Sequence, residues 1–230
     1  MNKFVPIIVL ILGIGTPSLA KAQKVEVAPG VTVTRKTYQV PINEAPFFNF
    51  AVRNAAQKAA DEQLVAGVLQ QIPDRSKAAG AALKSGTQAF LENQDFSTAA
   101  KRFNQAYLLD PQQSGIYHGF AMVVAARFKD FEYSDELFRV AARMKAPSLS
   151  LNADHGRTLL MAGRPNEAKP LLEKAVKDTP DWAVPRMNLA WAALLTGNKD
   201  EACRLIVLVK GQDLESVERD LALFKQKAGC

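Results

Sequence analysis

The sequence has few of the residues that build catalytic and metal sites. Its 230 residues include only two histidines and two cysteines, whereas a zinc site needs three or four converging ligands. His118 and His155 stand in neither an H-x-x-E-H nor an H-E-x-x-H arrangement. The sequence has no G-x-S-x-G elbow and no glycine-rich phosphate loop. We therefore expect a protein that is not an enzyme and that uses no cofactor and no metal.

The sequence also lacks a hydrophobic run of about 20 residues, the length that spans a bilayer. Its longest apolar stretch, Phe4 to Ile14, follows Lys3 and leads into the small-residue pattern Ala20-Lys21-Ala22. A positive start, a short apolar run and an A-x-A site are typical of a secretory signal peptide. Residues 1–22 are predicted to be cleaved near Ala22, which would place the mature chain in the periplasm; the alternative is an uncleaved anchor.

Neither sign of charge dominates the chain. Lysine and arginine number 29 against 23 acidic residues, a formal net charge of +6, and cleavage after residue 22 would remove Lys3 and Lys21. Because acidic residues are interleaved with the basic ones, this charge is typical of a solvated surface and not of a nucleic-acid footprint. We expect no nucleic-acid partner and no stable membrane insertion after cleavage.

What the sequence does contain is a repeat. A block with small and apolar residues at positions 1, 5 and 8 occurs four times, at steps of 35, 34 and 34 residues. The blocks are Ala99, Phe103, Ala106; Ser134, Phe138, Ala141; Ala168, Leu172, Ala175; and Ala202, Ile206, Val209. Self-similarity at this period predicts stacked helix pairs that bury their apolar faces against their neighbours.

The third repeat is the clearest. Gly156 falls within its first helix, where a small residue allows the paired helix to approach closely. Gly163 is placed to end that helix in the left-handed conformation, which costs glycine least. Pro180 closes the unit, because proline cannot continue a helix.

These features resemble the tetratricopeptide repeat (TPR) family, a 34-residue helix-turn-helix unit. The resemblance covers residues 79–213 and implies an all-α fold, a right-handed α-α superhelical solenoid of about four helix pairs. Residues 214–230 are predicted to form a C-terminal capping helix, because Leu214, Val217, Leu221 and Phe224 share one face. In residues 46–78 a long helix opened by Asn43 or Pro46 is expected to run to Gln71, either as an N-terminal cap or as a degenerate repeat.

Residues 23–45 have a different pattern. Val25, Val27, Val31 and Val33 alternate with polar residues around Pro29-Gly30, as strands do on either side of a turn. Because an isolated two-stranded hairpin is marginal in water, we favour a flexible arm. The alternative is a strand that pairs with the sheet edge of a partner.

The resemblance implies that the first helix of each pair lines a concave groove. The groove candidates, from the first repeat to the fourth, are Lys84, Gln88 and Leu91; Val123 and Arg127; Arg157, Leu160 and Met161; and Met187, Trp191 and Leu194. Basic residues at one end and apolar ones at the other favour a peptide with an acidic part and an apolar part. The pattern does not match the family's carboxylate clamp for chaperone tails. Packing of Trp191 between repeats is an open alternative, as tryptophan is highly buried on average.

The register of the repeats also interprets the histidines and cysteines. His118 and His155 fall where the family has core residues, so we expect both to be packing residues. Antiparallel helices turning near Gly211 would bring Cys203 opposite position 220, too far from Cys230 for a bridge, since bridged Cα atoms lie within about 7 Å. A buried, unbridged Cys203 is therefore favoured, with an internal disulfide or a link between two chains as alternatives.

Together these features predict an exported, non-catalytic adaptor that binds another protein or a peptide in the groove. The alternative is a structural component of a cell-envelope or secretion assembly, anchored through the N-terminal arm. The identity of the partner and the oligomeric state are not encoded in any motif found.

Overall fold

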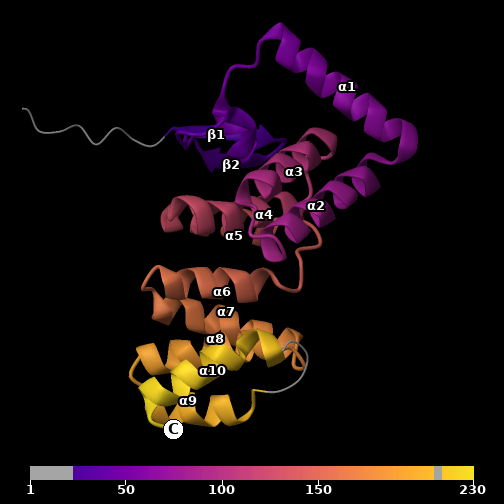
Figure 1. Cartoon of the computed structure of the whole chain (residues 1–230). Coiled ribbons are helices and arrows are strands. Elements are labelled where there is room, and N and C mark those ends of the chain that lie inside the picture. Colours follow the sequence, from indigo (N-terminus) through magenta and orange to yellow (C-terminus); the bar gives the residue numbers. More distant parts are fainter. Residues whose placement is uncertain (1–22, 210–213) are drawn as a thin grey trace, which may run out of the picture.

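The computed structural model describes residues 23–209 and 214–230, so the predicted signal peptide lies outside the described residues. Four antiparallel helix pairs stack one below the other (Figure 1), which confirms the predicted all-α solenoid. The pairs are α2 (Arg75–Leu91) with α3 (Phe96–Leu109), α4 (Ser114–Val123) with α5 (Phe131–Arg143), α6 (Leu151–Met161) with α7 (Pro165–Asp178), and α8 (Ala183–Leu195) with α9 (Lys199–Val207).

Glycines at the crossing points let the helices of the stack approach closely. A Cβ on Gly156 would lie 2.6 Å from Leu172 Cγ, which confirms the predicted role of this glycine between α6 and α7. In the upper pairs, Gly86 and Gly119 meet the ring of Phe103 in the same way, at 2.5 and 2.6 Å. The repeated apolar positions thus pack into space that only glycine leaves open.

The ends of the helices follow from local chemistry. Asp74, Asp95, Asp130 and Asn198 each accept a backbone N–H of the first turn that follows, so they cap α2, α3, α5 and α9. Gly163 adopts the predicted left-handed conformation (φ 72°). In the second pair, where the turn has no glycine, Lys129 adopts it instead (φ 56°), after a π-helical turn, η3 (Val124–Phe128), extends α4.

The N-terminal segment is not a flexible arm, contrary to the favoured expectation. Strands β1 (Lys24–Ala28) and β2 (Val31–Thr34) form an antiparallel hairpin in which Val25 pairs with Val33. Val33 is fully buried, and Glu136 of α5 accepts hydrogen bonds from Thr34 N and Thr34 Oγ1, both at 2.6 Å. The hairpin is stable because it docks on the helix stack, which supplies the apolar cover that two strands lack alone.

The expected helix opening at Asn43 or Pro46 is also wrong. Two 3₁₀ turns, η1 (Ile42–Glu44) and η2 (Pro46–Phe50), precede α1 (Ala55–Gln71), which begins at a capping box on Asn54. The turns are fixed from outside: Phe48 N donates to Asn104 Oδ1 (3.0 Å), and Asn104 Nδ2 donates to Ala45 O (2.8 Å). Tertiary hydrogen bonds therefore override helical propensity here. Helix α1 has no buried residue, and it packs only partly buried side chains against the first pair.

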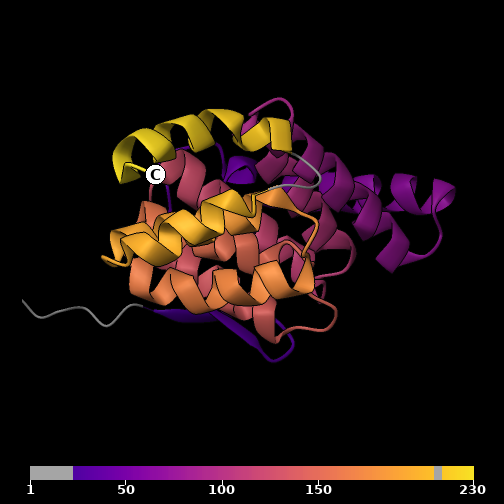
Figure 2. The same ribbon diagram turned by 90° about the horizontal axis from the view of Figure 1, so that it is seen from below.

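At the other end, α10 (Leu214–Ala228) covers the last pair. It packs mainly on α8, where Phe224 is fully buried and meets Trp191 at a centroid distance of 4.9 Å. Figure 2 shows α10 lying alongside the last helices. Cys203 lies opposite Cys230 and not opposite position 220, as had been assumed. Gly229 turns the end of the chain with a φ of 66°, which brings Cys230 toward Cys203. The two form a disulfide with a Cα–Cα distance of 5.7 Å, so the preference for an unbridged Cys203 was wrong.

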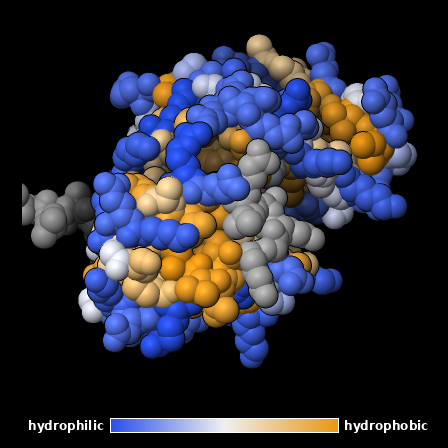
Figure 3. All heavy atoms as spheres, turned by 60° about the horizontal axis from the view of Figure 1, so that its bottom comes forward, coloured by the Kyte–Doolittle hydropathy of each residue, from blue (hydrophilic) through white to orange (hydrophobic). Residues whose placement is uncertain are grey.

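The surface at the C-terminal end is partly apolar. Figure 3 shows hydrophobic side chains gathered over the last helices, and Val207 and Leu208 at the end of α9 are 81% and 52% exposed. None of the helices in residues 23–209 and 214–230 has the length and apolarity needed to cross a bilayer.

Candidate functional site

A hollow of about 340 Å³ opens where the first three helix pairs meet. Its walls come from the end of α2, the start of α3, the α4–η3 segment and α6, so it spans three consecutive repeats. The lining is mostly apolar, and it comprises Phe90, Leu91, Gln94, Phe96, Met122, Ala125, Ala126, Asp154, Arg157, Thr158 and Met161.

The floor of the hollow is formed where α4 passes into the π-helical turn. Ala125 and Ala126 lie in η3, and their small side chains leave room above the backbone. The adjoining carbonyl of Ala121 accepts the hydroxyl of Ser134 at 2.8 Å, the residue that replaces the repeat's alanine in α5. π-helical turns are rare and occur frequently at functional sites. The hollow therefore lies beside a π-helical turn, where the regular helical geometry of the stack is broken.

Two large apolar side chains at the rim of the hollow are exposed to solvent. Leu91 is 63% exposed and Met161 is 50% exposed, one from α2 and the other from α6. Phe90 and Phe96 pack on each other below them, with ring centroids 5.1 Å apart. An apolar concave surface of this kind is what protein or ligand contacts cover.

Two ionisable residues of the hollow differ in their pairing. Asp154 Oδ2 lies 2.9 Å from Nε2 of His118, a histidine that is 6% exposed. Arg157, one turn further along α6, is exposed and has no ion-pair or hydrogen-bond partner for its guanidinium among the residues described. The hollow therefore offers an apolar surface with one available positive charge.

Only part of the predicted groove lines this hollow. Arg157, Met161 and Leu91 do, whereas Lys84 and Gln88 are exposed on α2 outside it. Gln88 donates to Glu92 at 2.8 Å along the same helix. Lys84 and Gln88 of the predicted groove therefore lie on the exposed surface of α2, outside the hollow.

Arg127 is engaged within the chain and does not face the hollow. Its guanidinium donates to the Glu44 carboxylate (2.8 Å) and to the Glu44 carbonyl (3.1 Å). Hydrogen bonds from Arg127 and Lys101 lower the pKa of Glu44 to about 2. Arg127 therefore fastens the N-terminal segment to the second repeat; its expected place in the groove was wrong.

The fourth repeat contributes nothing to the hollow. Met187 is fully buried, and Trp191 packs edge-to-face on Phe224 of the capping helix α10, where the alternative interpretation expected packing between repeats. Val123 is also fully buried, and Leu160 and Leu194 pack against the core clusters. Of the predicted Met and Trp patch, Met187 is core and Trp191 is partly buried, because α10 packs on α8 there.

Several residues of the hollow escaped the sequence-based reasoning. Phe90, Phe96 and Met122 line the hollow but were not assigned to the groove. The aromatic pair flanking the first turn, Phe90 and Phe96, was the available signal.

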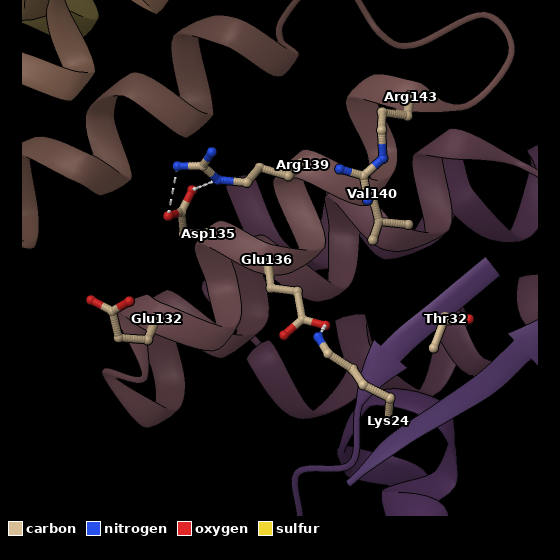
Figure 4. A pocket seen from close by; sticks show the side chains of 8 residues that line it. All are labelled: Lys24, Thr32, Glu132, Asp135, Glu136, Arg139, Val140 and Arg143. Carbon is tan, nitrogen blue, oxygen red and sulfur yellow. Dashed lines mark hydrogen bonds and ion pairs between the residues drawn. The ribbon is translucent and has the colours of Figure 1, made fainter. Parts of the chain in front are cut away.

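A second hollow lies between the hairpin and α5. Figure 4 shows Glu136 directed toward Lys24 of the hairpin, and Asp135 directed to the other side of α5, where it meets Arg139. Lys24 Nζ and Glu136 Oε1 are 2.8 Å apart, and Arg139 Nε donates to Asp135 Oδ1 at 3.0 Å. Its central charges are thus paired within the chain. In the part of the chain that the structure describes, no three His, Cys, Asp or Glu residues are grouped to hold a metal ion.

Comparisons with known proteins place the fold. Residues 159–218 match the tetratricopeptide repeat family. The crystal structure of YrrB, described as a TPR protein with an unusual peptide-binding site, superposes with a TM-score of 0.50 at 16% identity, covering 72% of this chain and 84% of that one. The crystal structure of MamA has a TM-score of 0.48 at 14% identity, over 72% and 88% of the two chains. No curated protein matches the sequence.

Proposed function

We propose that this chain, whose residues 159–218 match the tetratricopeptide repeat family, is a non-catalytic adaptor that binds a segment of another protein in the hollow between α2, α4 and α6. Repeat solenoids present extended concave surfaces of this kind for recognition. The observation that carries the proposal is the exposure of Leu91 and Met161 on the apolar rim of that hollow.

The chemistry of the hollow describes the segment it would take. Phe90, Met122 and Met161 offer an apolar surface, so the segment should carry an apolar anchor such as leucine, methionine or phenylalanine. Arg157 would pair with a carboxylate next to that anchor, since guanidinium groups bind carboxylates in a bidentate manner. An apolar residue beside an acidic one is therefore the proposed recognition element.

The proposed place of action is outside the cytoplasm, in the periplasm. The sequence of residues 1–22 supports this, and so does the bond between Cys203 and Cys230, because disulfides persist in oxidising compartments. Amino-terminal sequencing of the protein from its own cells would give a chain beginning at Gln23. A chain that retains residues 1–22 would contradict cleavage.

A structural role through the N-terminal arm is less well supported. The hairpin directs Lys24 and Thr34 to Glu136 of its own chain, and Tyr107 donates its hydroxyl proton to the carbonyl of Val27. A segment that is docked in this way has fewer groups to offer an assembly. The repeats are therefore the better candidate surface.

Site-specific photo-crosslinking in the native cells tests the proposed function. A photoreactive amino acid is placed at Leu91 or Met161 in the hollow, or at Leu149, which is 70% exposed in the α5–α6 connection and serves as the matched control. We expect the same discrete partner band from positions 91 and 161 and not from 149.

The charge of the site is tested in the same experiment. Arg157→Glu should abolish the band, whereas Arg102→Glu, which reverses another exposed charge on α3 outside the hollow, should leave it. A band of equal strength from position 149, or no band from 91 and 161, would contradict the proposed site.

A further inference from the structure

Both histidines of the chain bridge the same interface. His118 of α4 lies 2.9 Å from Asp154 of α6, and His155 of α6 lies 2.7 Å from Asp135 of α5. The interface is the one between the second and the third helix pair, and Phe138 lies between the two imidazoles. Its centroid is 5.6 Å from that of His118 and 4.8 Å from that of His155, which stacks on it with an interplanar angle of 12°.

The main apolar cluster ends on α6, the first helix of the third pair. One cluster of buried side chains extends from the hairpin to Leu151 at the start of α6. A separate cluster begins with Leu159 on α6 and continues into α7 and α8. Between them, the buried polar groups on α6 are His155 and Thr158. At this interface, the two histidine–aspartate pairs therefore help to hold the helix pairs together, and their strength depends on protonation.

His155 is buried beside a cluster of charged side chains of both signs. Its partner Asp135 already accepts two hydrogen bonds from Arg139 (3.0 and 3.2 Å) and pairs with Arg164 Nη2 at 2.9 Å. Figure 4 shows the carboxylate of Asp135 held by Arg139 on the side of α5 away from the hairpin. Two further anions pair with Arg164, Glu167 at 2.7 Å and Glu132 at 3.7 Å, and Arg143 lines the same hollow as His155. A protonated His155 would be the third cation at one carboxylate.

We infer that the interface between the second and third helix pairs is a pH-sensitive joint, in which protonation of His155 loosens α6 from α5 and weakens binding in the hollow. The inference rests on the proposed function for its second half. The coupling is geometric, because α6 carries Asp154, Arg157, Thr158 and Met161 of the hollow, whereas the remaining walls lie on the other side of the joint.

The environment of His155 determines whether acid favours the open or the closed form of the joint. Burial lowers its pKa, Asp135 raises it, and Arg139 and Arg164 lower it again; the net direction is downward from 6.5. When the joint is open and the ring is in water, the pKa returns to its usual value, so the open form binds the proton more tightly. Acid between pH 6.5 and the lowered pKa therefore favours the open form, by tenfold for each unit by which the pKa is lowered.

The other histidine faces a different set of charges. Asp154 of α6 is its charged hydrogen-bond partner, and the ring otherwise packs on Phe138. His118 is therefore the natural control for His155, since both pairs cross the same interface.

NMR of the whole mature chain tests the joint without any ligand. We expect the amide signals of α6 to change with the same midpoint as the ring signals of His155, below pH 6.5. His155→Gln keeps an N–H donor for Asp135 but cannot be protonated, and it should remove that transition. His118→Gln should retain it. Signals of α6 that do not follow the titration of His155, or a transition that persists in His155→Gln, would overturn the joint.

A second variant covers the case in which His155→Gln does not fold. Arg139→Gln removes one cation from an arginine whose side chain is 54% exposed. Because Arg139 lowers the pKa of His155, its loss should move the α6 transition to higher pH. An unchanged midpoint would overturn the assigned charge cluster.

The photo-crosslinking yield from position 161, compared at pH 7.5 and 5.5, separates the two proposals. A lower yield at pH 5.5 that is abolished by His155→Gln supports the coupling. If the α6 transition occurs but the yield does not change, the coupling is overturned and the joint stands. If no partner is captured at either pH while α6 still responds, the proposed function fails independently.

Discussion

At the scale of single residues, the glycines of the crossing points decide whether the helix pairs can form. Gly86 and Gly119 approach Phe103 from two different helices, and Gly156 approaches Leu172. These contacts are closer than a Cβ tolerates, and the side chains of Phe103 and Leu172 that would be met are fully buried. The close packing of the helix pairs therefore depends on these glycines as much as on the apolar side chains.

Gly86→Ala should destabilise the chain by about 1–3 kcal/mol, because the new Cβ overpacks the core against Phe103. Gly80→Ala, in the same helix α2, should be neutral or stabilising by up to about 1 kcal/mol, since nothing lies within 4 Å of that position. Urea unfolding of both variants measures the difference. Equal stability of the two would argue against the packing described.

Single residues also show which side chains of the candidate site could be located from the sequence and which could not. Arg157 and Met161 could be placed because α6 is a regular helix whose register the repeat defines. Arg127 could not, because the π-helical turn and the bond to Glu44, 83 positions away, are set by tertiary structure. Trp191 is covered by α10, and its packing depends on how that helix docks.

At the scale of elements, docking onto the stack gives the N-terminal hairpin its structure. The alternation of valines was typical of strands, although a flexible arm was favoured, and two strands are present. Their attachment was not predictable, because it depends on Glu136 and on Tyr38, which stacks on Phe128 at 3.9 Å. For the same reason the left-handed backbone at Phe47–Phe50 has no local signal: Asn104 imposes it from a distant helix.

Glu136→Ala should undock the hairpin, because it removes the acceptor of Lys24 Nζ and of both Thr34 donors. The expected loss is about 1–3 kcal/mol, the cost of leaving a partly buried donor unpaired. Limited proteolysis near Pro29-Gly30 reports the undocked state. The control is Glu132→Ala, one turn earlier on α5, whose side chain is 85% exposed; cleavage that is equally fast in both variants would contradict the assigned contacts.

The disulfide should act on α10 and leave the rest of the stack in place. It closes a loop of 27 residues, for which about 2–4 kcal/mol is typical. Cys203→Ala with Cys230→Ala should loosen α10 and change the fluorescence of Trp191, which packs on Phe224. Unfolding of the double variant at the same urea concentration as the parent, with no change in fluorescence, would contradict this.

At the scale of the whole molecule, the second and third helix pairs meet at an interface that combines apolar contacts with two buried histidine–aspartate pairs. The repeat period predicted the stacking, because each pair buries its face only against its neighbours. The polar pairs between the second and third helix pairs were not predictable, since His118 and His155 occupy positions that the repeat reserves for packing. They do pack, on Phe138, but they also form hydrogen bonds across the interface.

Acid should destabilise the molecule in two stages. His155, with its pKa lowered from 6.5 mainly by burial, favours the fold above pH 6.5, and this contribution is lost as the pH falls through the lowered value. The pKa values of Asp135 and Glu136 are lowered by hydrogen bonds that outweigh burial, and that of Glu44 is lowered to about 2. Their contribution is present above about pH 4.5 and is lost below it. Stability measured by urea unfolding from pH 8 to 3 should show both stages, and His155→Gln should remove the first.

The central claim is that the hollow between α2, α4 and α6 is the binding surface. The most direct measurement is the affinity of the captured partner for the purified chain and for two charge variants, Met161→Asp in the hollow and Leu149→Asp in the α5–α6 connection. An acid placed among Met122, Leu91 and Ala126 should weaken binding at least about tenfold, which is about 1.4 kcal/mol, while Leu149→Asp leaves the affinity unchanged. Unchanged affinity in Met161→Asp, or equal losses in both variants, would contradict the account.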